Sequence, residues 1–269
     1  MEYIKDAVEK ARKERDEKAA TGAQTEQVSG GANPAEVSEA HGEPRSEHAQ
    51  SRVEQLDPTI LMENRVVAAF DNDERAEPYR QLRTQVLTKF RQNNWKTLAV
   101  TSAHSGAGKT LTAVNLAITI AKERNQTVLL VDMDFKGPNV LDMLGLSTDK
   151  GLLDYLAGEA ELSEILVNPG LERLTLLPST PVAGTTSEWL SSPRMKAVLE
   201  DIVNRYSDRL VIFDLPPLLR DDDALVFTPY TDAALLVVES EVSTPEDMER
   251  CVQLLEGSNI LGTVFNKAS

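Results

Sequence analysis

The chain has 269 residues, of which 43 are acidic and 28 are basic, so its formal net charge is −15 at pH 7. This acidity argues against broad, sequence-independent binding of nucleic acid and against adhesion to anionic lipid, because both need a cationic surface. The single cysteine, Cys251, excludes an intrachain disulfide and a zinc site built on paired cysteines. The sequence also contains no apolar run long enough to cross a membrane, which predicts a cytoplasmic protein that a partner would have to recruit to a membrane.

The first part of the chain divides into a helix and a linker. Residues 1–19 predict an amphipathic helix, because Ile4, Ala7, Val8 and Ala11 repeat at helical spacing among charged residues. This helix is either a docking element or a solvated helix. Residues 20–55 contain no Phe, Tyr or Trp and few large aliphatic residues, which predicts a disordered linker. A folded domain is expected over 56–269.

Helices and strands alternate within the expected domain. Residues 75–92 predict a helix with Leu82, Val86 and Phe90 on one face. Runs rich in Val, Leu and Ile then alternate with helical patterns, which predicts an α/β fold with a mostly parallel sheet covered by helices on both faces. The expected strands are 97–103, 127–132, 171–178, 209–214, 232–239 and 259–265, and the expected helices between them are 110–124, 192–206 and 244–257.

The loop between the first of these strands and the helix after it predicts a phosphate-binding P-loop. It contains Gly106, Gly108, Lys109 and Thr110, and Ala103 replaces the first glycine of the usual pattern. Glycines let the backbone N–H groups approach phosphate oxygens, Lys109 would neutralise the β- and γ-phosphates, and the Thr110 hydroxyl would bind Mg²⁺. The expected nucleotide-binding residues of the loop are Ser105, Gly106, Ala107, Gly108, Lys109, Thr110 and Leu111.

Carboxylates end two other predicted strands. Asp132 ends the strand 127–132 and Asp134 comes two residues later, and Asp214 ends the strand 209–214. Ligands of open α/β sheets bind at the carboxyl ends of the strands. The three segments are therefore expected to meet at one metal–phosphate site.

These motifs resemble those of the bacterial tyrosine kinases (BY-kinases) of capsule and exopolysaccharide synthesis, which are related to partition and division-site ATPases. The Walker A loop of that family matches residues 103–110, its Walker A′ motif matches 131–134, and its Walker B motif matches 213–216. The Glu-x-x-Arg-x-x-Arg helix of the family matches Glu77, Arg80 and Arg83. The resemblance covers roughly residues 56–269 and implies a P-loop NTPase fold that uses ATP and Mg²⁺.

The resemblance also implies roles for single residues. Asp132 would accept the proton of an incoming tyrosine hydroxyl, and Lys109 would act in catalysis beside it. Asp134 and Asp214 would hold Mg²⁺ or its waters, together with Thr110. Asn266 would contact the nucleotide base. Lys136 stands where the family usually has an arginine.

The implied function is an ATP-dependent protein-tyrosine kinase that regulates exopolysaccharide or capsule synthesis and export. The implied partner is a membrane-embedded polysaccharide co-polymerase whose cytoplasmic tail activates the kinase. Glu77, Arg80 and Arg83 would build contacts in a homo-oligomeric ring. Family members commonly end in a tyrosine cluster, which this sequence lacks, so phosphorylation is expected on Tyr3, on another internal tyrosine or on the partner. Tyr3, on the N-terminal arm, is the best internal candidate.

Two other functions compete with the kinase. One is a nucleotide-gated assembly factor that binds and hydrolyses ATP without phosphorylating tyrosine. The other is a partition-type ATPase, a class that carries an additional lysine four residues before the main one. Ser105 occupies that position here, which favours the kinase.

Overall fold

The computed structural model describes residues 52–184, 186–204, 208–220 and 222–268. The predicted helix over 1–19 and nearly all of the predicted linker over 20–55 lie outside these residues. The linker prediction extends too far at its end, because Arg52–Val53 forms strand β1 and pairs in parallel with β4 (Val167–Asn168). The described part of the folded domain therefore begins with Arg52 rather than with residue 56.

The described strands form one eight-stranded sheet in the order β1-β4-β5-β3-β6-β2-β7-β8. All neighbouring strands are parallel except β4 and β5. The mostly parallel sheet and its six predicted strands are confirmed, whereas β1 and β4 have two residues each and give no recognisable pattern. The remaining strands are β2 (Thr97–Ser102), β3 (Thr127–Asp132), β5 (Leu174–Leu177), β6 (Arg209–Asp214), β7 (Ala233–Glu239) and β8 (Ile260–Asn266).

The four long predicted helices of the domain are present as α3 (Glu77–Asn93), α4 (Lys109–Ala121), α9 (Pro193–Asn204) and α11 (Pro245–Leu254). Local signals explain some of their ends: Thr244 and Asp247 form a capping box at the start of α11. The other helices have only four to six residues, too few for a clear 3.6-residue period. They are α2 (Pro58–Glu63), α5 (Val140–Met143), α6 (Leu152–Ala157), α7 (Leu162–Ile165), α8 (Ser187–Leu190) and α10 (Asp223–Phe227).

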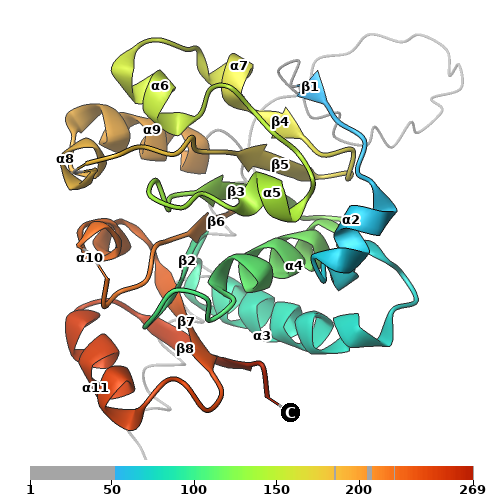
Figure 1. Ribbon diagram of the computed structural model, residues 1–269, viewed down its shortest axis with the longest axis vertical. Coiled ribbons are helices and arrows are strands. Elements are labelled where there is room, and N and C mark those ends of the chain that lie inside the picture. Colours follow the sequence, from blue (N-terminus) through green and yellow to red (C-terminus); the bar gives the residue numbers. More distant parts are fainter. Residues whose placement is uncertain (1–51, 185, 205–207, 221, 269) are drawn as a thin grey trace, which may run out of the picture. The chain divides into compact units, whose positions relative to one another are not determined.

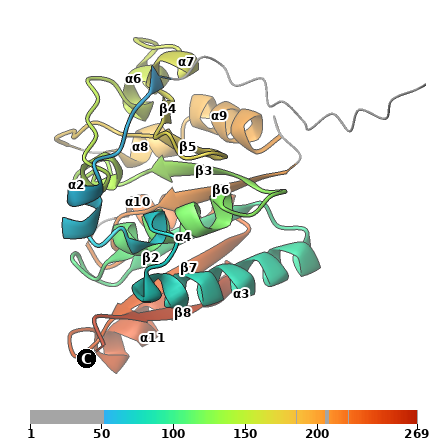
Figure 2. The same ribbon diagram turned by 90° about the vertical axis from the view of Figure 1, so that its right-hand side faces the viewer.

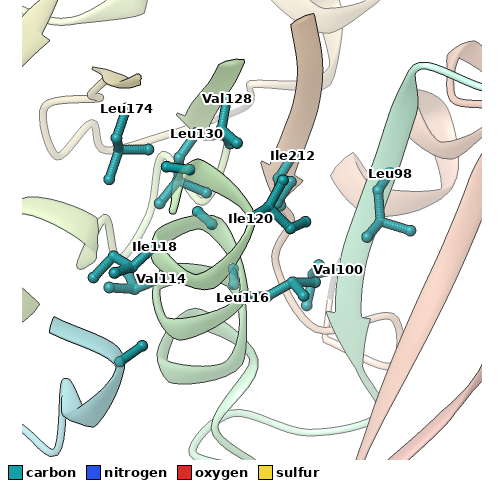
Figure 3. Packing of buried hydrophobic residues seen from close by; sticks show 14 of the residues in the cluster. Leu98, Val100, Val114, Leu116, Ile118, Ile120, Val128, Leu130, Leu174 and Ile212 are labelled. Carbon is teal, nitrogen blue, oxygen red and sulfur yellow. The ribbon is translucent and has the colours of Figure 1, made fainter. Parts of the chain in front are cut away.

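Helices cover both faces of the sheet (Figures 1 and 2). Side chains of a strand alternate between the faces, so Leu98 and Val100 of β2 join one apolar cluster while Ala99 joins the other. Helices α3 and α4 lie over the first face, where Val114, Leu116, Ile118 and Ile120 of α4 pack near strand residues such as Leu130 and Ile212 (Figure 3). Helices α6, α9, α10 and α11 contribute to the second cluster. Burial on both faces holds the central strands in a fixed register.

Helix α4 is also tied to the segment before α3 through one buried amide. The Asn115 side chain accepts a hydrogen bond from the Ala68 N–H (2.9 Å) and donates to the carbonyls of Arg65 (3.2 Å) and Leu111 (3.0 Å). Asn115 is fully buried. This amide therefore fixes residues 65–68 against the helix that begins at the P-loop.

We expect Asn115→Ala to destabilise the domain, because it leaves the buried N–H of Ala68 without its acceptor. The free energy of unfolding should fall by about 1–3 kcal/mol. Urea denaturation of the full chain measures it. The control is Asn93→Ala, since among the described residues the exposed Asn93 amide bonds only to the Lys89 carbonyl of its own helix. Equal denaturation midpoints for the two variants would contradict a structural role for the Asn115 amide.

Candidate active site

Strand order brings the three sequence motifs to one edge of the sheet. Strand β6 lies between β3 and β2, and Asp214 pairs in register with Asp132 of β3 and with Val100 of β2. The three strands are parallel, so the segments that follow them leave the sheet side by side. The expected convergence of the phosphate loop with the two aspartate motifs is present in the structure.

The loop before α4 has the backbone conformation that its glycines permit. Gly106 and Gly108 have φ of +85° and +94°, values that residues with a Cβ rarely adopt. A Cβ on Gly108 would also lie 2.0 Å from the Asn266 side-chain nitrogen, which donates a hydrogen bond to the Ala107 carbonyl at 2.8 Å. The end of β8 thus packs directly on the loop, and the first turn of α4 leaves its backbone N–H groups without helical acceptors.

Lys109 is buried and contacts two of the predicted aspartates. Its Nζ lies 2.9 Å from Asp134 Oδ2 and 3.7 Å from Asp214 Oδ2. Burial alone would lower the pKa of the ammonium group, but the charges of Asp214 and Asp134 outweigh it and raise the pKa. Lys109 is therefore a permanent cation at this edge of the sheet.

The Asp132 carboxylate is buried beside Lys109 but is held by backbone groups. Its Oδ2 accepts from the N–H groups of Asn139 (2.9 Å) and Val140 (3.0 Å), and its Oδ1 accepts from that of Asp134 (3.1 Å). Burial, followed by the charge of Asp214, raises its pKa to about 7. A carboxyl group with this pKa is suited to accept a proton near neutral pH.

Asp214 is fully buried and has a free oxygen. Its Oδ2 accepts from the Thr110 hydroxyl at 2.6 Å, whereas its Oδ1 has no hydrogen-bond partner among the described residues. Burial raises its pKa, against the opposing effect of Lys109. An unpaired carboxylate oxygen beside a threonine hydroxyl is a donor set that fits Mg²⁺, which is bound through one or two carboxylates with water and phosphate oxygens. Asp134, with 5% of its surface exposed, completes this set.

A cavity of about 670 Å³ lies over the loop, in the size range of small-molecule sites. Three predicted site residues do not line the cavity and are buried. They are Asp132, Asp214 and Ala107. The predicted residues that line it are Ser105, Gly106, Gly108, Lys109, Thr110, Leu111, Asp134 and Asn266.

Basic residues that the sequence analysis did not identify also line the cavity. They come from four separate segments, and no recognised motif contains Arg65, Arg75 or Arg220, although Arg75 lies two residues before Glu77 and Arg220 six residues after Asp214. Lys136, at the position where an arginine was expected, instead lies 3.9 Å from Asp223 Oδ2 and does not line the cavity. The additional basic lining residues are Arg65, Arg75, Arg220 and Lys267.

The predicted oligomerisation residues lie near the start of α3 and form contacts within the chain. Arg80 pairs with Glu77 at 3.1 Å and donates to the carbonyls of Asp71 and Asp73. Arg83 pairs instead with Glu123, which follows α4, at 3.1 Å. Glu77 remains half exposed, so the charged face is accessible although its arginines already have partners.

Comparison with known proteins agrees with this geometry. An AAA-domain family model matches residues 95–254. Tyrosine-protein kinase YwqD of Bacillus subtilis is 31% identical, over 71% of this chain and 80% of its own. Among solved structures, the kinase domain of Escherichia coli tyrosine kinase ETK is 31% identical with a TM-score of 0.68, covering 74% of this chain and 79% of its own. The chimerical protein CapA2B2 is 25% identical with a TM-score of 0.71, covering 80% and 92%. The chain therefore belongs to the bacterial tyrosine-kinase (BY-kinase) family of P-loop ATPases.

Proposed function

We propose that this protein is an ATP-dependent protein-tyrosine kinase that regulates exopolysaccharide or capsule synthesis and export. The observation that supports it best is the contact of Lys109 with Asp134 and Asp214 at the base of the cavity. A buried cation, two buried carboxylates and a threonine hydroxyl next to a glycine-rich loop are the parts that phosphoryl transfer requires. Family membership at about 31% identity supports the same activity.

In this proposal the loop residues from Ser105 to Leu111 bind the phosphates, and Asn266 contacts the base. Thr110, Asp134 and Asp214 hold Mg²⁺, which neutralises phosphate charge when bound. The tyrosine oxygen forms a bond to the γ-phosphorus, the bond between that phosphorus and the β–γ bridging oxygen breaks, and ADP leaves. Asp132 accepts the proton of the tyrosine hydroxyl. Its raised pKa, about 7, suits that task.

The proposed partner is a membrane-embedded polysaccharide co-polymerase whose cytoplasmic tail activates the kinase. Within the described residues no helix is long and apolar enough to cross a bilayer. We propose that this partner recruits the protein to the inner face of the membrane, with residues 1–19 and the linker as a tether. Glu77, Arg80 and Arg83 would join neighbouring subunits by exchanging their present contacts for contacts with another copy.

A second candidate is a nucleotide-gated assembly factor that hydrolyses ATP without phosphorylating tyrosine. It is favoured by the position of Asp132, since both carboxylate oxygens of Asp132 accept hydrogen bonds from backbone N–H groups and the residue does not line the cavity.

Mass spectrometry after incubation with Mg-ATP separates the candidates. Phosphate on Tyr3, on another tyrosine or on the partner's tail supports the kinase, and hydrolysis without phosphotyrosine supports the assembly factor. A partition-type ATPase is the less favoured function, because the chain belongs to the tyrosine-kinase family.

We expect Lys109→Met to abolish Mg-ATP binding, because it removes the charge that neutralises the β- and γ-phosphates. Isothermal titration with Mg-ATP measures the effect. Lys89→Met is the matched control, since Lys89 is exposed on α3 and far from the loop in sequence.

A melting curve of each variant tests whether it is folded, because Lys109→Met leaves two buried carboxylates without their cation. Should the variant not fold, Thr110→Ala provides the alternative measurement and should weaken Mg²⁺-dependent binding. Wild-type affinity in a folded Lys109→Met protein would refute the proposed nucleotide site.

Substitutions of Asp132 and Asp214 are expected to impair different steps of the reaction. Asp132→Asn keeps an oxygen that can accept the N–H groups of Asn139 and Val140 but removes the proton acceptor, so tyrosine phosphorylation should slow by roughly a hundredfold or more while ATP still binds. Asp214→Asn removes a charge that faces the metal, so the Mg²⁺ concentration giving half-maximal activity should rise. Phosphorylation assays over a Mg²⁺ series distinguish the two effects.

The matched control for both variants is Asp149→Asn, because Asp149 is an exposed loop residue that does not line the cavity. If Asp132→Asn phosphorylates tyrosine at the rate of this control, Asp132 is not the base.

A further inference from the structure

The loop that follows β6 is fixed against the start of the phosphate loop. The N–H groups of Leu218 and Leu219 donate to the carbonyls of Ser102 (2.8 Å) and Ala103 (3.2 Å). The Thr101 hydroxyl, in turn, donates to the Pro216 carbonyl at 2.8 Å. These hydrogen bonds restrict the backbone up to Leu219, so they hold the next residue, Arg220, beside the phosphate loop.

The Arg220 side chain reaches the phosphate loop itself. Its Nη1 donates to Ser105 Oγ at 3.2 Å, and both residues line the cavity. A guanidinium group carries five N–H donors in a planar fork that matches phosphate oxygens, and a neutral hydroxyl occupies one of them here. Exchange of that hydroxyl for a phosphate oxygen would replace a neutral hydrogen bond by a stronger, charge-assisted one.

The charge of Arg220 is less compensated than that of most other basic residues at the cavity. Lys109 pairs with Asp134, Arg75 with Asp73 at 2.6 Å, and Lys267 with Glu239 at 2.8 Å. Arg220 forms no ion pair with a carboxylate of the described residues. Arg65 has none there either, but no side-chain bond joins it to the phosphate loop. Arg220 is thus the basic side chain that is both unpaired within the described chain and bonded to that loop.

Its place in the chain indicates which phosphate it would meet. Arg220 lies six residues after Asp214, on the loop that follows β6. Asp214 Oδ2 lies 3.7 Å from Lys109 Nζ, and the lysine at this position of a P-loop reaches the β- and γ-phosphates. We propose that Arg220 is a phosphate-binding residue that contacts the terminal phosphate of ATP from within the same chain and so makes the site prefer ATP to ADP. This inference rests on the proposed nucleotide-binding function and adds a residue that none of the recognised motifs contains.

The test is a comparison of affinities for ADP and for a non-hydrolysable ATP analogue, each with Mg²⁺, by isothermal titration of the full chain. Arg220→Ala should weaken binding of the ATP analogue by roughly tenfold or more, the size of a lost charged hydrogen bond, and leave ADP affinity almost unchanged. Arg220→Lys keeps the charge without the planar fork of donors, so its affinity for the ATP analogue should lie between those of the wild type and Arg220→Ala. Arg91→Ala, on the exposed end of α3, is the control for loss of one arginine.

The outcomes separate this inference from the proposed function. A wild-type protein that binds neither nucleotide would overturn both. A wild-type protein that binds both, with the same ATP-to-ADP preference in Arg220→Ala, would overturn the inference alone. Equal weakening of both nucleotides would also overturn it, because Arg220 would then hold the loop rather than the terminal phosphate. A selective loss that Arg220→Lys partly restores supports it.

Discussion

The buried ammonium group of Lys109 is the interaction on which the rest of the site depends. A cation that is only 8% exposed is tolerable because Asp134 and Asp214 contact it directly. Burial also raises the pKa values of Asp214 and of the neighbouring Asp132, because it disfavours their charged forms. The cluster holds three carboxylates for one ammonium group, a set that fits the divalent cation proposed to bind beside the phosphates.

Basic side chains line the cavity, although the molecule as a whole is acidic. A chain of net charge −15 would repel a nucleotide at long range, yet arginine and lysine side chains from separate segments gather around the cavity. Several of them are held by carboxylates outside the cavity lining, as Lys267 is by Glu239. Such pairs keep the basic side chains in position and reduce their mutual repulsion. Basic side chains are therefore gathered at the place where phosphates would bind.

The apolar layers make this geometry possible. Strands β2, β3 and β6 are buried on both faces, so a shift of one residue in register would move a whole set of Val, Leu and Ile side chains to the wrong layer. The same register sets Asp132 opposite Asp214. Helix α4 packs in the first apolar layer and begins with Lys109, so one element contributes to the core and carries a residue proposed to bind phosphate.

The sequence by itself determined the sheet-forming segments and the long helices of the domain. It also determined the glycine loop and the strand-ending aspartates, because each of these depends on neighbours close in the chain: apolar periodicity, glycine backbone freedom, and the position of a carboxylate at a strand end. Only the tertiary structure decided the pairing of Arg52–Val53 with β4 and the contact of Arg220 with Ser105 across 115 positions. It also decided that Asp132 is held by the N–H groups of Asn139 and Val140. Strand order and side-chain reach are set by packing between distant segments, and no local pattern records them.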